Sequence, residues 1–151
     1  MREGSGGAGK YRGGLGIERK VTARTPLTFN AEVDRMHCAP WGLEGGLDGA
    51  GNGVSLHLNE GAKKDFPNAK ILMQRLRPGE GFTACSGGSG GFGPPVERDA
   101  SRVAHDVAEG YISAEDAESV YGVVLSEDGN VDEAATKVKR SQKSRMRIAG
   151  R

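Results

Sequence analysis

Glycine and proline are concentrated in the first part of this chain, and this restricts what the chain can fold into. Residues 1–95 hold 21 of the 25 glycines and all six prolines, whereas the remaining 56 residues hold four glycines and no proline. Dense glycine and proline predict short strands joined by turns, and their absence permits helices. We therefore expect an α+β fold: a β-rich segment over residues 1–95 and a helical segment with a basic tail over residues 96–151, together one structural unit of a larger domain.

Alternating apolar and polar residues predict where the strands lie. The clearest case is residues 27–33, where every second residue is apolar, as in a strand with one buried face. Similar patterns predict further strands at residues 17–21, 54–58, 69–76 and 81–85. Between the last two, Pro78 and Gly79 suit the central positions of a type II turn, so we expect these two strands to form a hairpin.

Capping residues mark the helices of the second part. The residues suited to begin them are Asp99, Ser113 with Asp116 in a capping box, and Asn130 with Glu133. Gly110 suits the left-handed position after the first helix. On that helix, His105 and Asp106 are expected to face solvent. The third helix is expected to run toward Arg147 with few apolar residues to bury.

The overall composition excludes several classes of protein. The net charge is +1, and there is neither a run of about 18 apolar residues nor an apolar stretch behind the first charges. We therefore expect no membrane span, no signal peptide and a cytoplasmic location. Residues 137–151 contain seven basic residues and no acidic one, but without interleaved aromatic residues a solvated helix end is favoured over nucleic-acid binding. Bulky apolar residues are scarce, so the β-rich part needs a partner surface.

The opening glycines resemble a nucleotide-binding loop but lack its chemistry. Gly4, Gly9 and Lys10 have the spacing of a phosphate-binding loop. The next residue of that motif is Ser or Thr, whose hydroxyl binds magnesium, and here it is Tyr11. A buried strand should precede the loop, and only three residues do. The sequence argues against a nucleotide site here.

Two stretches are candidates for a ligand-adjacent site. The first is the loop with Gly87, Gly88, Gly90 and Gly91, whose successive amides are suited to form a nest for phosphate or carboxylate. The alternative, a turn where only glycine fits, is favoured. The second candidate is Asp34 with Arg35, which follow the clearest strand; Arg35 is suited to hold an anion by two parallel hydrogen bonds, and a structural ion pair is the alternative.

Other polar residues give weaker signals. His37, Cys38, His57 and Cys85 are potential zinc ligands, but their spacing lacks the close pairs of structural zinc sites, so we predict no metal site. Trp41, which follows a proline, is expected to be a packing residue. The residues do not identify a nucleophile or a general base.

Three stretches together resemble the hydantoinase B/oxoprolinase family, which includes the alpha subunits of acetone carboxylases. They are "GSGGAGKYRGGLGIER" (residues 4–19), "DRMHCAPWGLEGGLDGAGN" (residues 34–52) and residues 76–125, with their glycine cluster, Gly-Pro-Pro and Arg-Asp passages. The resemblance is to the carboxy-terminal portion of a much longer family chain. It implies that this chain is a piece of a larger subunit and that its opening glycines form tight internal connections.

The resemblance also implies an activity. Family members work with an A-type subunit that handles ATP, and together they open cyclic amides such as hydantoins or 5-oxoproline, while relatives carboxylate ketones. It implies ATP and a divalent metal for the full complex, with none bound by this chain, and the remainder of the B-type subunit as a partner. The chain alone is expected to be inactive. A purely structural module and a truncated relic are alternatives.

Overall fold

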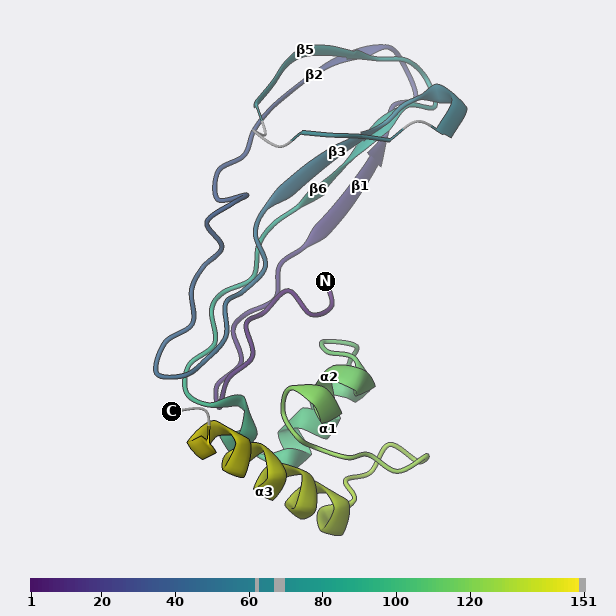
Figure 1. Cartoon of the computed structure of the whole chain (residues 1–151). Coiled ribbons are helices and arrows are strands. Elements are labelled where there is room, and N and C mark those ends of the chain that lie inside the picture. The colour runs from purple at the N-terminus through teal and green to yellow at the C-terminus, as the bar shows by residue number, and fades with distance from the viewer. Residues whose placement is uncertain (62, 67–69, 150–151) are drawn as a thin grey trace.

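The chain is elongated, with strands at one end, helices at the other and long irregular segments between them (Figure 1). The structure, a computed structural model, describes residues 1–61, 63–66 and 70–149. Its described strands lie between residues 18 and 85 and its described α-helices between residues 100 and 149. This distribution follows the split in glycine and proline content and confirms the α+β class.

The strands form two antiparallel sheets. They are β1 (Glu18–Thr22), β2 (Leu27–Glu32), β3 (Gly53–His57), β4 (Lys63–Asp65), β5 (Lys70–Leu76) and β6 (Gly81–Cys85). The larger sheet has the order β1-β6-β3-β4, and β2 pairs with β5 in a separate two-stranded ribbon. Strand β2 lies within the strand predicted over residues 27–33. Ala69, the predicted start of the fourth strand, lies outside the described residues.

The predicted hairpin between the last two strands is wrong. The turn itself is present: Gly79 has a φ of 90°, and the Glu80 amide donates to the Arg77 carbonyl at 3.0 Å. However, β5 pairs with β2 and β6 pairs with β1 and β3, so the turn leads from one sheet to the other. A turn sequence fixes the local reversal of the chain, whereas the strand partners depend on which apolar faces meet.

A small apolar core joins the two sheets. Leu56 from β3 and Leu76 from β5 are fully buried together with Ala23. The rings of Phe29 and Phe82 stack across the sheets with centroids 4.1 Å apart. Residues from both sheets thus share one core, which explains why the alternating stretches fold as strands despite few bulky side chains.

The helical end confirms two of the three predicted caps. The helices are α1 (Ala100–Ala108), α2 (Ala114–Ser119) and α3 (Glu133–Ala149), with short 3-10 turns at Asn59–Gly61 and Pro95–Glu97. The Asp99 and Ser113 side chains accept amide hydrogen bonds as N-caps, and Gly110 has a φ of 67°. The predicted cap at Asn130 is wrong. Asp132 accepts from the Ala135 amide instead, at 2.9 Å, because α3 begins one residue after Asp132.

The helical end has its own core. It contains Val103, Ile112, Ala117, Tyr121 and Val123, all buried. Polar contacts join helix α3 to the segments that flank the other two helices. The Thr136 hydroxyl accepts from the Val124 amide at 3.0 Å, and the Arg140 guanidinium donates to the Arg98 carbonyl at 2.6 Å. These bonds explain how a helix with few apolar residues stays docked.

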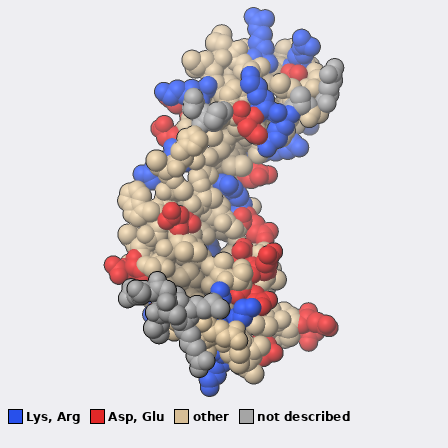
Figure 2. Space-filling view, viewed as in Figure 1, with Lys and Arg blue, Asp and Glu red and all other residues tan. Residues whose placement is uncertain are grey.

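Charged side chains are unevenly distributed over the surface. In the view of Figure 2, basic side chains gather over the strands at the upper end and acidic side chains run along one side of the lower half. Within the described part of the chain, none of the helices combines the length and the apolar character needed to cross a lipid bilayer.

Candidate functional site

Three glycine-rich segments run side by side between the sheets and the helices (Figure 1). We call residues 4–16, 40–52 and 86–93 the glycine bundle. Main-chain hydrogen bonds join every pair of segments: the Gly7 amide donates to Ser89, the Leu47 amide to Ala8, and the Gly91 amide to Leu47, over 2.7–2.9 Å. The opening glycines are therefore part of a backbone assembly, and Lys10 forms a surface ion pair with Glu97 at 3.4 Å.

The glycines of the bundle are required by close backbone approach. A Cβ atom on Gly88 would lie 1.9 Å from the Ser5 carbonyl oxygen, and one on Gly90 would lie 1.9 Å from that of Trp41. Real Cβ contacts of this kind are never so short. At these positions side chains are thus excluded, because neighbouring main chains occupy their space.

The predicted amide nest lies inside this bundle. The Gly88 amide donates to the Ala50 carbonyl at 3.1 Å and the Gly91 amide to that of Leu47 at 2.9 Å. The Gly87 amide donates to the Asn52 side chain at 2.5 Å. These three N–H groups therefore bind protein acceptors in this chain. That this loop lies beside a ligand stays a prediction.

Asn52 brings the two predicted stretches together. Its side-chain Nδ2 donates to the Asp34 carbonyl at 2.7 Å, and its side-chain Oδ1 accepts from the Gly87 amide. Its backbone amide donates to the Arg35 carbonyl at 3.2 Å. Arg35 has a φ of 54°, a left-handed conformation that is uncommon outside glycine. The loop after β2 and the start of the last glycine segment thus meet at one asparagine.

Arg2 adds a second connection beside this junction. Its Nη1 donates to the Gly51 carbonyl at 2.8 Å and to the Ser86 carbonyl at 3.3 Å. Sequence reasoning missed both Arg2 and Asn52. Their signal is weak, because a single polar residue beside glycines is a common feature of loops. The side chains of Asp34 and Arg35 are exposed, so the junction holds their backbones and leaves their charged groups facing outward.

Replacing Asn52 tests the junction. Asn52→Ala removes one acceptor and one donor, and we expect the free energy of unfolding to fall by about 1–3 kcal/mol, the effect of leaving partly buried backbone groups unpaired. Asn52→Asp keeps the acceptor for Gly87 but sets a second acceptor oxygen against the Asp34 carbonyl, so it should destabilise the chain as well. Urea denaturation monitored by circular dichroism measures both. Equal stability of Asn52→Ala and the wild type would contradict the role of the junction.

A buried ion cluster ties the glycine bundle to α1. The Asp106 carboxylate accepts from Arg12 Nε at 3.0 Å and from an Arg98 Nη at 2.9 Å. The expectation that Asp106 faces solvent is wrong, because residue 106 is buried against these two guanidinium groups, while His105 is exposed as predicted. The helical pattern alone could not show this, since both arginines lie outside α1 in the sequence.

Tyr121 lies close to the ion cluster and is almost fully buried. Its hydroxyl has no hydrogen-bond partner among the described residues. Burial, only partly offset by the positive charge of Arg98, raises the pKa of Tyr121 from 10.0 to about 12. The folded chain therefore holds the phenol proton more tightly than the unfolded chain does.

This shift predicts how stability depends on pH. The contribution of Tyr121 is fully present below pH 10 and is lost as the pH rises through about 12, by roughly 2–3 kcal/mol in total. Tyr121→Phe should lack this loss and should match the wild type near neutral pH, because the hydroxyl makes no bond to the described residues. Denaturation at a series of alkaline pH values measures it, with Tyr11→Phe as the exposed control. An identical alkaline loss in Tyr121→Phe would contradict the assignment.

Two of the four residues considered for zinc have separate partners. His57 Nε2 bonds with the Thr83 hydroxyl at 2.6 Å, and the Cys85 thiol donates to the Glu18 carboxylate at 3.7 Å. Within the described residues, no group of three or more His, Cys, Asp or Glu side chains is placed to hold a metal ion. The described part of the chain therefore offers no ligand set for a divalent metal, and a metal in a larger complex stays an expectation.

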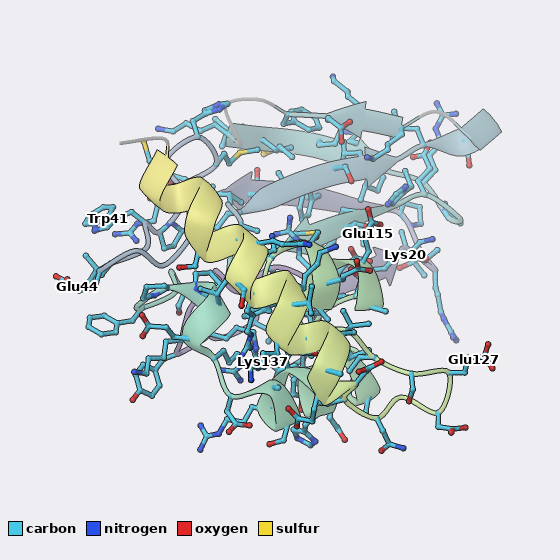
Figure 3. The ribbon with its side chains drawn as sticks, turned by 60° about the horizontal axis from the view of Figure 1, so that its bottom comes forward. Lys20, Trp41, Glu44, Glu115, Glu127 and Lys137 are labelled. Atoms are coloured by element: carbon cyan, nitrogen blue, oxygen red, sulfur yellow. The ribbon has the colours of Figure 1, made fainter. Side chains whose placement is uncertain are left out.

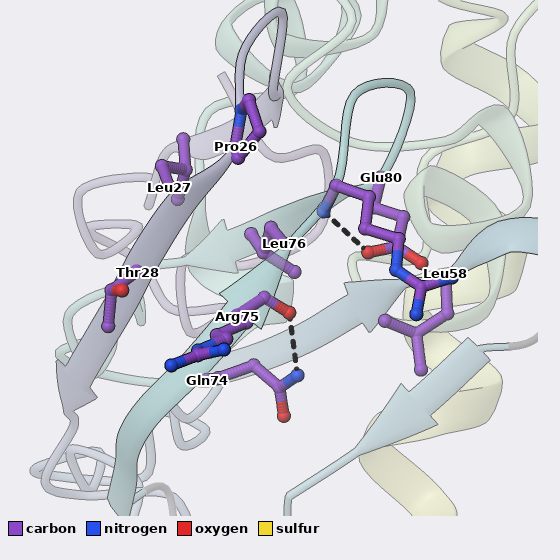
Figure 4. Close-up of a pocket in the computed structure, with 9 residues that line it drawn as sticks. Pro26, Leu27, Thr28, Leu58, Gln74, Arg75, Leu76 and Glu80 are labelled. Atoms are coloured by element: carbon purple, nitrogen blue, oxygen red, sulfur yellow. Dashed lines mark hydrogen bonds between the residues drawn. The ribbon is translucent and has the colours of Figure 1, made fainter.

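A cavity of about 850 Å³ opens beside the β2–β5 ribbon (Figure 4). Its lining includes Leu58, Arg75, Arg77 and Glu80. The Glu80 carboxylate accepts from the Arg77 amide at 2.7 Å and from the Asn59 amide at 3.3 Å, and these bonds, led by that of Arg77, lower the pKa of Glu80 below its usual value. Glu80 is thus held as an ionised structural carboxylate rather than as a proton donor.

Comparison with known proteins relates this architecture to one family. The sequence profile of the Hydantoinase B/oxoprolinase family matches residues 1–95. Caprolactamase subunit beta from Pseudomonas jessenii is 32% identical over 141 residues, which are 91% of this chain and 24% of that subunit. A 5-oxoprolinase from Saccharomyces cerevisiae is 35% identical over 94 residues, covering 62% of this chain and 7% of that protein.

Solved structures agree with the sequence comparison. A nucleotide-free structure of acetone carboxylase, from work on ATP-dependent acetone carboxylation, matches with a TM-score of 0.82 at 27% identity, over 99% of this chain and 24% of that one. The crystal structure of the ATP-dependent caprolactamase from Pseudomonas jessenii matches with a TM-score of 0.75 at 26% identity, over 92% of this chain and 24% of that one. This chain spans about a quarter of the length of the curated relatives that it matches over most of its own length. In sequence and in fold, the chain belongs to the hydantoinase B/oxoprolinase family.

Proposed function

We propose that this chain is the carboxy-terminal portion of a hydantoinase B-type subunit in an ATP-dependent enzyme that opens cyclic amides such as hydantoins or 5-oxoproline. One observation carries the proposal: 91% of the chain matches a quarter of caprolactamase subunit beta. The match to a 5-oxoprolinase supports the same class of substrate. Both free thiols, Cys38 and Cys85, suit the reducing cytoplasm, where we place the enzyme.

The geometry supports a structural contribution within that enzyme. The glycine bundle is a backbone assembly joined at Asn52 to the loop after β2 and at Asp106 to α1. Such an assembly suits the fixing of neighbouring parts of a subunit relative to one another. We place the ATP-dependent activation of the amide carbonyl, and the attack of water that follows it, in the remainder of the B-type subunit and in an A-type subunit. The isolated chain is therefore proposed to be inactive.

A second function is the carboxylation of a ketone in an enzyme of the acetone carboxylase type. The observation that favours it is the structural match, which has the higher TM-score, 0.82 against 0.75, and the higher coverage, 99% against 92%. The two functions share ATP-dependent activation. They differ in what reacts with the activated species, which is water in one case and a carboxyl donor in the other.

Reconstitution separates these functions. The chain is purified alone and with the remainder of a B-type subunit and an A-type subunit, and ATP consumption is measured with hydantoin, 5-oxoproline, or acetone plus bicarbonate. We expect ATP-dependent ring opening by the complex and none by the chain alone. Turnover by the isolated chain would contradict the proposal that it is inactive without the other subunits. Acetone carboxylation without ring opening would select the second function, and failure to join either subunit would favour a separate structural module or a relic.

A further inference from the structure

An exposed apolar patch lies on the glycine bundle. It consists of Tyr11, Trp41, Leu43 and Phe92, which are 58%, 69%, 55% and 48% exposed. The chain has one tryptophan and only 5% aromatic residues, so bulky apolar side chains are scarce in it. Trp41 was expected to be a packing residue, but its side chain points away from the protein backbone, on the same side as Glu44 (Figure 3). Contiguous exposed apolar surface of this kind marks interaction sites.

The patch is continuous because all three segments of the bundle meet at Phe92. Isolated bridges pair Phe92 with Tyr11 on one side and with Leu43 on the other, and the Tyr11 and Phe92 ring centroids are 6.3 Å apart. Leu47 is 48% exposed and lines a groove of about 490 Å³ together with Pro95 and Val120. The bridged residues Tyr11, Leu43 and Phe92 therefore form the centre of the patch.

The backbone under the patch is held firmly. The Leu43 amide donates to the Gly91 carbonyl at 2.9 Å, and the amides of Tyr11 and Phe92 each donate to the other residue's carbonyl, at 3.0 and 2.9 Å. A surface that is ordered before binding loses little conformational entropy when a partner covers it. The patch therefore combines two properties of a stable interface, apolar side chains and a preorganised backbone.

We infer that this patch is where the remainder of a B-type subunit packs against the chain. The inference rests on the proposed function. In the acetone carboxylase and caprolactamase structures, the part that matches this chain is 24% of a single polypeptide, so about three quarters of such a polypeptide accompany this fold. A second copy of this chain is the competing occupant.

A chimeric subunit tests the inference. In it, this chain replaces the matching quarter of Pseudomonas jessenii caprolactamase subunit beta, and thermal unfolding is compared with that of the isolated chain. Leu43→Ser is expected to leave the isolated chain nearly unchanged, because Leu43 is 55% exposed there, and to lower the melting temperature of the chimera by about 2–4 °C. Leu72→Ser is the matched control: Leu72 lies on β5 and is 79% exposed. It should have the same small effect in both proteins.

Three outcomes would overturn the inference. One is a wild-type chimera that does not fold as a unit, and another is an effect of Leu43→Ser in the chimera no larger than that of Leu72→Ser. The third is an isolated chain that forms dimers in sedimentation experiments and loses them with Leu43→Ser, since a second copy would then occupy the patch. A chimera that melts as expected but does not hydrolyse caprolactam would count against the proposed function and leave the patch assigned.

Discussion

Gly90→Ala is expected to destabilise this chain by about 4 kcal/mol or more, enough to prevent folding in many small proteins. The added methyl group would lie 1.9 Å from the Trp41 carbonyl oxygen and 2.5 Å from its carbon. These are backbone atoms in a hydrogen-bonded assembly, so they cannot move aside as a flexible side chain would. Relief requires separating two segments of the bundle.

Gly14→Ala is the matched control, because Gly14 lies in the same bundle and has open space around it. The nearest atom to a Cβ at this position would be the Ser89 hydroxyl oxygen, 3.7 Å away. The effect of the substitution should stay within about 1 kcal/mol, and alanine's smaller unfolded-state entropy favours stabilisation. Denaturant unfolding measures both variants. Equal stability of the two would show that close approach does not set the glycine requirement. Neither Gly90 nor Gly91 has a positive φ, so steric exclusion, and not backbone conformation, is the reason.

Asp106→Asn is expected to cost about 3–5 kcal/mol, because it leaves two buried guanidinium groups without their counter-charge. Arg12 and Arg98 both approach this carboxylate, at 3.0 and 2.9 Å, and the side chains of all three are largely buried. Asparagine keeps the shape of aspartate and removes its charge. The fall in the free energy of unfolding should therefore measure the electrostatic contribution of the cluster. The substitution should also weaken the connection between the glycine bundle and α1.

The control for this prediction is a surface pair. Glu97→Gln breaks the ion pair with Lys10, whose two side chains are about half exposed, and should cost less than about 1 kcal/mol. Thermal unfolding followed by circular dichroism compares the two variants. If Asp106→Asn were no more destabilising than Glu97→Gln, the buried cluster would not be what stabilises the contact between the glycine bundle and α1.

Local features of the fold were predictable from the sequence, because they depend on neighbouring residues. Asp99 and Ser113 begin helices where their side chains accept amide bonds within three residues, and Gly79 and Gly110 adopt the left-handed conformations that their positions require. Strand positions followed from alternation. In contrast, the pairing of β5 with β2 depends on contacts between residues 38 to 49 positions apart, which no local pattern specifies.

The candidate site shows the same division. Asp34, Arg35 and Gly87 could be chosen from the sequence as polar or glycine-rich positions in loops, but the asparagine that connects them could not. Asn52 is recognisable only when the two loops lie on either side of it. Asp106 was assigned to the solvated face of a helix because the helical pattern says nothing about Arg12, which lies 94 residues away.

By itself, the sequence determined that the first part of this chain bends often and buries little, that helices follow it, and which family the whole resembles, since these depend on residue types and short spacings. The tertiary structure alone decided what the glycines are for. Main chains that are distant in sequence come close enough to leave no room for a Cβ atom at positions such as Gly88 and Gly90, while aromatic residues such as Trp41 lie on the outer surface. A glycine in the sequence does not show which segment packs against it, because steric exclusion between segments depends on how they pack.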